Sequence, residues 1–341
     1  MKNPFVTNGY VSPEYFCDRE IETAKIFSLL TNENNIALIS PRRLGKTDLL
    51  RHCFGQPEIK EHYHTFIIDI YATSSVRDFV NVFGKAVLDE LRPKGKSVWG
   101  TFLNVLASLR SEITFDMNGQ PTWGIGLGAI TNPSATLDEI FSYLNNAGKP
   151  CLIAIDEFQQ ITKYADDPNI EAALRTHIQR CSNAHFVFSG SHRHLMGAMF
   201  TSPARPFYQS VTLINLPPIS VDKYAEFCLR HFERASKHLD TLVVTELYER
   251  FNGITSYMQK VMNILFSMTG TGEICIPSMI DTAINDLLDF SADTYDALLY
   301  QMPEKQRIVF MAIAAEGKAK AISSGDFVRK YKLQSASSVS S

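Results

Sequence analysis

The stretch that decides the fold is Ser40-Pro41-Arg42-Arg43-Leu44-Gly45-Lys46-Thr47. It matches the phosphate-binding loop pattern G-x-x-x-x-G-K-[ST] at every position except the first, where Ser40 stands in place of glycine. Pro41 has a fixed φ and holds the residue before it extended, so the corner of the loop is expected to tolerate a serine. The sequence therefore predicts a loop that cradles a polyphosphate.

The residues on either side supply the elements that such a loop needs. Residues 35–39 (NIALI) form a short apolar run typical of a buried strand, and residues 47–54 have the spacing of a helix that buries one face. A strand, a tight loop and a helix N-terminus together point backbone N–H groups at phosphates. Lys46 is expected to reach the β- and γ-phosphates, and the Thr47 hydroxyl to bind Mg²⁺. The remaining ATP- or ADP-binding residues are expected to be Ser40, Pro41, Arg42, Arg43, Leu44, Gly45 and Asp48.

Length, charge and cysteine content narrow the class of protein. The chain has 341 residues, enough for two or three domains, and a net charge of −3, which argues against a protein coated in nucleic acid. Its six cysteines are scattered without a C-x-x-C pair, so we expect neither a metal cluster nor a disulfide framework. No apolar run approaches the ~20 residues that cross a bilayer. We expect a cytoplasmic protein without a membrane partner.

Five short apolar runs alternate with helical patterns along the first two thirds of the chain. Such near-continuous strands are typical of a parallel sheet that helices cover on both faces, and ligands of these sheets bind beyond the carboxyl ends of the strands. The sequence therefore predicts an α/β fold with its site at that edge. The runs are residues 35–39, 64–70, 151–156, 185–189 and 211–216.

A second candidate site motif is CLIAIDE, at residues 151–157, a buried strand that ends in two adjacent carboxylates. In enzymes with a phosphate-binding loop, the first acid holds Mg²⁺, largely through water, and the second polarises the attacking water. Asp156 is thus the expected metal ligand and Glu157 the expected catalytic base. The alternative is a strand that simply meets solvent in two acids, but the loop upstream favours hydrolysis.

Two further catalytic candidates follow the later strands. The fourth strand runs into Ser189-Gly190-Ser191, where related ATPases carry a polar residue that senses the γ-phosphate. Ser191 is the candidate and Ser189 stands behind it, with a plain serine–glycine turn as the alternative. Arg205, just before the fifth strand, could act as an arginine finger on a second copy of the chain. It could equally anchor its loop by pairing with a carboxylate, which is the interpretation that we favour.

The remaining sequence divides into an insertion, a lid and a C-terminal unit. Asn118-Gly119 predicts a β-hairpin within an insertion at about 110–130, and the glycines of residues 123–128 are expected in a strand or bulge. We expect the ATPase core at 1–217, a helical lid at 218–290 and a partial winged helix at 291–341. The lid and terminal helices are predicted over 221–234, 240–251, 256–268, 276–289, 303–315 and 324–331.

With these motifs in hand, the chain resembles the archaeal-type ATPase family in the STAND class of P-loop NTPases, which are related to AAA+ and origin-recognition proteins. Residues 15–20 (YFCDRE) look like the family's F-x-G-R-E box beside the adenine, with Asp18 where glycine is usual. Residues 252–259 are similar to the lid's G-x-P box, with Thr255 where proline is usual. The other matching motifs are the loop at 40–47, the acid-bearing strand at 152–158 and the sensor strand at 188–191.

The resemblance implies a parallel sheet of order 5-1-4-3-2 and a nucleotide clamped between this sheet and the lid. It places Phe16 and Tyr257 against the nucleotide. It also implies a molecular switch, in which ATP and Mg²⁺ hold lid and core together and hydrolysis releases them.

Two other functions remain open at this stage. One is a DNA-associated loader or regulator that acts through the winged helix, whose basic residues are Lys318, Lys320, Arg329, Lys330 and Lys332. The other is a scaffold that holds ADP without appreciable turnover. The sequence also leaves open a protein partner at the C-terminal helices and self-association of the chain.

Overall fold

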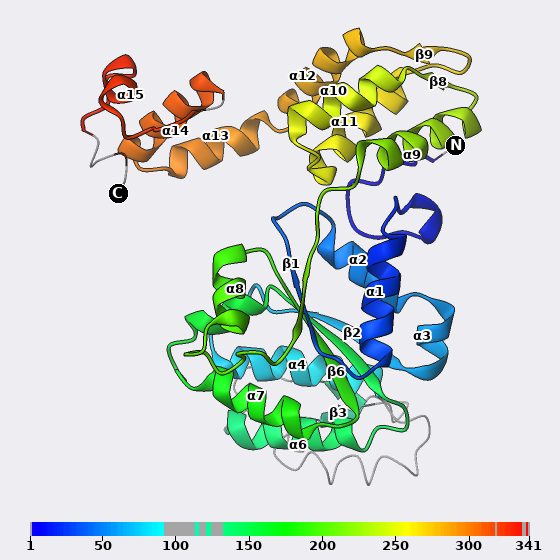
Figure 1. The fold of residues 1–341 in the computed structure, drawn as a ribbon, viewed down its shortest axis with the longest axis vertical. Coiled ribbons are helices and arrows are strands. Elements are labelled where there is room, and N and C mark those ends of the chain that lie inside the picture. Colours follow the sequence, from blue (N-terminus) through cyan, green and yellow to red (C-terminus); the bar gives the residue numbers. More distant parts are fainter. Residues whose placement is uncertain are drawn as a thin grey trace. The chain divides into compact units, whose positions relative to one another are not determined.

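The computed structural model describes residues 2–91, 132–317, 319–335 and 339, together with the backbone of two short strands at 113–115 and 121–123. The chain forms two compact units, Met1–Pro277 and Ser278–Ser341, which are described separately below (Figure 1). The expected domain boundaries near residues 217 and 290 stay a prediction.

The first unit is built on a five-stranded parallel sheet. Its strands lie in the order β2-β5-β6-β1-β7, which is 5-1-4-3-2 when the five are numbered along the chain. This confirms the predicted α/β fold of a P-loop NTPase and the predicted strand order. The strands are β1 (Ile36–Ile39), β2 (His64–Asp69), β5 (Cys151–Asp156), β6 (Ala184–Gly190) and β7 (Thr212–Asn215).

Side chains alternate between two apolar layers, as the period of a β-strand requires. On β5, Ile153 and Ile155 face one layer while Leu152 and Ala154 face the other. Figure 1 shows the two sets of helices on opposite sides of the sheet. The first layer includes α4 (Val76–Glu90), α6 (Pro133–Asn145), α7 (Ile170–Arg180) and α8 (Arg193–Thr201), and the second includes α1 (Glu20–Thr31), α2 (Lys46–Phe54) and α3 (Pro57–His62).

The helical segment that follows the sheet contains α9 (Val221–Arg234), α10 (Thr241–Phe251) and α11 (Thr255–Met268). Two short parallel strands, β8 (His238–Leu239) and β9 (Ile274–Cys275), join it. The helix expected over 276–289 begins only at Ile280, because residues 274–275 pair with β8 and the 3-10 turn η5 (Pro277–Met279) follows them. The sequence pattern is continuous there, and a long-range strand pairing overrides it.

The N-terminal arm, residues 3–5, is anchored in this helical segment. Phe5 is fully buried and contacts the rings of Phe232 and Phe266. The Asn3 side-chain amide donates to the Asn263 carbonyl oxygen at 2.7 Å, and the Asn263 amide donates to the Phe5 carbonyl oxygen at 2.7 Å. The arm thus joins the chain's start to α11.

The insertion contains the expected hairpin. Strand β3 (Ile113–Phe115) pairs antiparallel with β4 (Pro121–Trp123). The Asn-Gly turn at 118–119 and the glycines at 124, 126 and 128 lie outside the described residues.

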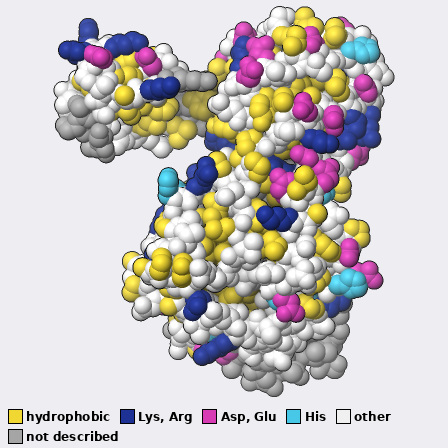
Figure 2. Space-filling model, viewed as in Figure 1, with side chains coloured by type: hydrophobic (Ala, Val, Ile, Leu, Met, Phe, Trp, Pro, Cys, Tyr) yellow, Lys and Arg dark blue, Asp and Glu magenta, His cyan; other side chains and the backbone are white. Residues whose placement is uncertain are grey.

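The second unit is helical and small. It contains α12 (Ile280–Asp289), α13 (Ala292–Gln301), α14 (Glu304–Glu316) and α15 (Gly325–Lys330). Ala312 and Phe327 form a small core with Leu333. Figure 2 shows hydrophobic side chains on the surface of this unit, and Tyr300 is 85% exposed. Throughout the described ranges of both units, each helix is too short or too polar to cross a membrane.

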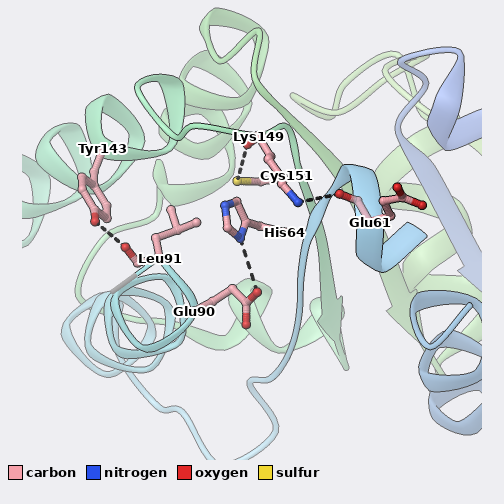
Figure 3. A network of polar contacts seen from close by, with 7 residues as sticks. All are labelled: Glu61, His64, Glu90, Leu91, Tyr143, Lys149 and Cys151. Carbon is pink, nitrogen blue, oxygen red and sulfur yellow. Dashed lines mark hydrogen bonds and ion pairs between the residues drawn. The ribbon is translucent and has the colours of Figure 1, made fainter. Parts of the chain in front are cut away.

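Polar contacts secure the amino-terminal edge of the sheet (Figure 3). His64 begins β2, and its Nδ1 lies 3.5 Å from Oε1 of Glu90 at the end of α4. The Lys149 ammonium, just before β5, donates to the Glu61 carbonyl oxygen at 2.5 Å. The Tyr143 hydroxyl of α6 donates to the carbonyl oxygen of Leu91 at 2.8 Å. These contacts fasten helices and loops to the edge that lies opposite the predicted site.

Candidate functional site

The carboxyl ends of β2 and β5 and the loop after β1 border a cavity of about 490 Å³. This volume lies within the range of small-molecule sites. Four parts of the chain form its wall: the N-terminal region between residues 6 and 19, the loop 42–48, the strand ends at 69, 71 and 156–157, and residues 219, 255, 256 and 259 near or within the helical segment. The cavity therefore lies at the edge of the sheet that the sequence predicted.

The loop after β1 has the conformation that an anion-binding loop needs. Gly45 has a φ of +85° at the start of α2, and Arg43 has a φ of +70°. Lys46 is 7% exposed, and its ammonium donates to the carbonyl oxygens of Ser40 at 3.1 Å and Pro41 at 3.3 Å. Burial lowers the pKa of Lys46, while the charges of Asp156 and Glu157 oppose this shift. A buried ammonium that is held by two carbonyls is ready to meet a phosphate.

Asp156, at the end of β5, accepts hydrogen bonds from two hydroxyl groups. Its Oδ2 accepts a hydrogen bond from the Thr47 hydroxyl, and its Oδ1 accepts one from the Ser189 hydroxyl at 2.7 Å. A hydroxyl and one carboxylate in contact fit Mg²⁺, which takes its other ligands from water and substrate phosphates. In the described part of the chain, no group of three or more His, Cys, Asp or Glu side chains could hold a metal without such help.

Glu157 is held beside Asp156 in a conformation that is uncommon for a residue with a side chain. Its φ is +55°, and its Oε2 accepts hydrogen bonds from the Ser191 hydroxyl at 2.9 Å and from the Gln159 amide. The Ser191 hydroxyl in turn accepts one from Arg42 Nε at 3.3 Å. Left-handed residues cluster at functional sites. Each predicted sensor serine thus donates to one acid of the pair: Ser189 to Asp156 and Ser191 to Glu157.

Another part of the wall is aromatic. Phe16 stacks on His52 with ring centroids 4.4 Å apart, and the Tyr10 hydroxyl lies 3.1 Å from His52 Nδ1. Burial lowers the pKa of His52, which favours its neutral form. The planar faces of Phe16 and Tyr10 suit a flat heterocycle.

Two buried polar groups in the wall have no hydrogen-bond partner. Arg19 is 3% exposed and donates from Nη1 to Glu22 at 2.7 Å, whereas its Nη2 is unpartnered. The Thr255 hydroxyl is likewise buried without a partner. Because unpaired buried polar groups are rare in folded proteins, these two atoms are candidate ligand contacts.

The phosphate-binding loop also contacts the helical segment directly. The Arg43 guanidinium donates to the Tyr257 hydroxyl and lies 4.9 Å from the centre of its ring. The backbone N–H of Ser256 donates to the Arg43 carbonyl oxygen at 3.2 Å. Tyr257 is not part of the cavity wall. The sequence analysis placed it against the nucleotide, whereas the structure pairs it with the phosphate-binding loop.

The predicted site residues fall into three groups. The wall of the cavity contains Phe16, Arg42, Arg43, Leu44, Gly45, Lys46, Thr47, Asp48, Asp156 and Glu157. Ser40, Pro41, Ser191 and Tyr257 contact members of this wall. Arg205 instead pairs with Glu171 of α7 and borders a separate hollow. Its action on a second copy stays a prediction.

Sequence reasoning missed several residues of the wall. Asp69 and Tyr71 follow β2, whose carboxyl end could have marked them. Tyr10 lies in a loop without any motif. Gln159, which contacts Glu157 from outside the wall, follows the acid pair by two positions without a signal of its own.

Comparisons with known proteins agree with this fold. A family described as a probable winged helix domain matches residues 293–341. No curated protein matches the chain. Among solved structures, the chain is similar to a Walker-type ATPase of Pyrococcus abyssi, with a TM-score of 0.63 and 17% identity over 96% of this chain and 87% of that one.

Two Aeropyrum pernix structures are also similar. The ORC2 protein in ADPNP-ADP complexes has a TM-score of 0.60 and 13% identity, over 97% of this chain and 82% of that one. The ORC1 protein in complex with DNA has a TM-score of 0.55 and 14% identity, over 94% and 78%. At such identities the likeness is one of fold. The chain thus has the fold of a P-loop ATPase and carries a winged helix at its C-terminal end.

Proposed function

We propose that the protein binds ATP with Mg²⁺ and hydrolyses it, as a nucleotide-dependent switch of the STAND type. The observation that carries this proposal is the contact between the Thr47 hydroxyl and Asp156, with Glu157 beside it and Lys46 in the same cavity wall. These are the groups that phosphoryl-transfer enzymes use to bind a polyphosphate and activate water.

Each of these side chains has a proposed role. Lys46 and the N–H groups at the start of α2 bind the phosphates, and Thr47 and Asp156 hold Mg²⁺. The metal, when bound, neutralises charge on the phosphate oxygens. Glu157 accepts a proton from the attacking water, and Ser191 orients Glu157 and senses the γ-phosphate. Phe16 and Tyr10 pack against the adenine base of the nucleotide.

The switch itself is proposed to act through Arg43. Its side chain contacts Tyr257 and its carbonyl oxygen accepts from Ser256, so the phosphate-binding loop and the helical segment are directly connected. A nucleotide that binds one arrangement of this contact more tightly than another shifts the population toward that arrangement. ATP and ADP differ at the γ-phosphate, close to the same loop.

A second candidate function is DNA binding by the C-terminal unit. The winged-helix match at 293–341 favours it, and a similar structure is an ORC1 protein in complex with DNA. Lys305, Lys320 and Lys332 are exposed on this unit. DNA affinity of the protein that falls steeply with salt would support this function, and lack of binding at low salt would remove it.

The decisive experiment is steady-state ATP turnover at several protein concentrations, for the wild type and for Glu157→Gln. A matched control is Glu90→Gln, which changes a carboxylate at the opposite edge of the sheet. We expect turnover that the control retains and Glu157→Gln loses by about 100-fold or more, while ATP still binds.

The remaining outcomes separate the alternatives. Specific activity that rises with protein concentration would indicate self-association, and Arg205 would then be the residue to test for action on a second copy. Background turnover in all three proteins, with tight ADP binding, would identify a scaffold and refute the ATPase proposal. Equal turnover in the wild type and Glu157→Gln would show that the base is a different group.

A further inference from the structure

Gln159 is a buried residue of the site to which no sequence motif assigns a role. It lies in the 3-10 turn η4 (Phe158–Lys163) directly after the acid pair. The turn is fixed by Phe158, which is fully buried and packs against Phe188 with ring centroids 4.4 Å apart. The place of the Gln159 backbone beside Glu157 is therefore set by the core.

The Gln159 side chain makes an incomplete set of hydrogen bonds. It is 3% exposed, its amide nitrogen donates to Glu157 Oε2, and its Oε1 has no partner. Leaving a buried acceptor unpaired costs stability, so a purely structural residue at this place would be better apolar. Among the described residues, the contact with Glu157 is the feature that accounts for an amide here.

The neighbouring strand leaves room for this amide. A Cβ atom at Gly190 would lie 2.4 Å from Gln159 Oε1 and 2.6 Å from the Met196 side chain. A Cβ atom there would require the Gln159 amide or the Met196 side chain to shift, so glycine at the end of β6 leaves the amide in place beside Glu157. The next residue, Ser191, donates to the same Glu157 oxygen at 2.9 Å.

We propose that Gln159 is a positioning residue for Glu157. The Gln159 amide and the Ser191 hydroxyl both hold Oε2, which leaves Oε1 as the oxygen that takes the proton from the attacking water. In that step a water O–H bond breaks and the proton passes to Oε1. The water oxygen bonds to the γ-phosphorus, and the bond to the β-phosphate oxygen breaks with its electron pair leaving on ADP. The proton then returns to the released phosphate. This inference rests on the proposed ATPase function.

Gln159→Met tests the inference, because methionine keeps the length of the side chain and removes the donor. The matched control is Gln160→Met, since the neighbouring glutamine donates to the Thr73 carbonyl oxygen at 2.9 Å and not to Glu157. We expect kcat to fall about 10- to 100-fold in Gln159→Met, with KM and the Kd for ATP within about twofold of wild type. Gln160→Met should retain kcat. Gln159→Asn, whose amide is too short to reach, is a second variant with the same expected loss.

A double variant separates positioning from packing. In a Glu157→Gln background, Gln159→Met should reduce the residual turnover by no more than about twofold, because the carboxylate that it positions is gone. A kcat for Gln159→Met within about twofold of wild type would overturn the inference, as would an equal loss in both backgrounds or a matching loss of ATP affinity. Wild-type protein without turnover would overturn the ATPase proposal as well, so the two failures are distinguishable.

Discussion

The two edges of the central sheet differ in how completely their polar groups are paired. At the amino-terminal edge, the Asn183 amide donates to the carbonyl oxygens of Leu144 and Ala147 at 3.0 and 3.1 Å, and Asn35 accepts from the Phe186 N–H at 2.8 Å. At the carboxyl edge, Lys46 is buried against carbonyls and Gln159 keeps an unpartnered oxygen.

This difference separates residues that stabilise the fold from residues whose polar groups are available to bind a ligand. Complete pairing lowers the free energy of the native state, whereas strained or unpaired groups persist where a function requires them. Arg43 and Glu157 have left-handed φ values beside the cavity, although Glu33 and Gln209, before β1 and β7, have such values as well. Substitutions at the carboxyl edge should therefore alter ligand binding or turnover, whereas substitutions at the amino-terminal edge should alter stability.

The largest expected effect is on ATP affinity and comes from replacing Lys46 by alanine, with Lys149 as the matched control. Lys46→Ala removes a buried cation that meets the phosphates, and the affinity for ATP should fall by about 2–5 kcal/mol, or roughly 30- to several-thousand-fold. Lys149→Ala, at the opposite edge, removes an exposed side chain that donates to the Glu61 carbonyl oxygen and should leave the affinity within about twofold. Isothermal titration calorimetry of both variants measures this contrast. Equal affinities would show that Lys46 does not contact the nucleotide.

The second effect is on stability. Asn183→Ala leaves the Leu144 and Ala147 carbonyl oxygens without their side-chain donor and should lower the free energy of unfolding by about 1–3 kcal/mol. Urea denaturation followed by circular dichroism measures the change. ATP affinity at a temperature where the variant is folded should match the wild type. A loss of affinity without a loss of stability would contradict the division between the two edges.

Ser191→Ala should produce a smaller change, at the carboxyl edge. The variant removes one of the two donors to Glu157 Oε2, so turnover should fall by about tenfold while Gln159 still holds the carboxylate. Ser142→Ala on the exposed face of α6 is the control and should have no effect. Stopped-flow phosphate release resolves the difference. If Ser191→Ala instead weakens ATP binding with kcat intact, the serine acts on the phosphate and not through Glu157.

The smallest expected effect concerns pH and the amino-terminal half of β6. Burial lowers the pKa of His185 from the ordinary 6.5, with Glu33 opposing the shift. Between that lowered value and 6.5 the unfolded chain binds a proton that the folded chain does not, so stability falls as the pH is lowered through this window. Denaturation curves from pH 7 downward should show a shallower fall for His185→Gln than for the wild type. The exposed His194→Gln should follow the wild type.

The fold was predictable because its strands are buried on both faces and therefore read as continuous apolar runs. The predicted strand Cys151–Asp156 matches the structure to the residue, and the other predicted strands differ by one residue at one end or at both ends. The strand order followed from the family resemblance and not from the runs themselves. The start of α12 was missed because the pairing of β9 with β8 is decided by residues that are far apart in the sequence.

The site was predictable only where its chemistry imposes a fixed spacing. The loop of residues 40–47 and the pair Asp156–Glu157 have such a spacing, since a helix start and a strand end position them. Tyr10 belongs to the site through a tertiary contact with His52, which leaves no mark on the local sequence. Gln159 lies only two positions from Glu157, but its contact depends on the geometry of the turn η4, which no motif indicates. The sequence places Tyr257 against the nucleotide, whereas its contact with Arg43 follows from geometry alone.

The anchoring of the N-terminal arm has a consequence for how the protein is made. Asn3 bonds to Asn263, and 260 positions of sequence separate them. A ribosome delivers the arm before the strands of the sheet, and α11 after them, so the sheet can assemble while residues 3–5 still lack their partner in α11. Contacts of such long sequence separation form late, because closing the intervening loop costs entropy. The cavity wall at residues 6–10 lies next to this arm, so a newly synthesised chain should gain its nucleotide site only after α11 has left the ribosome.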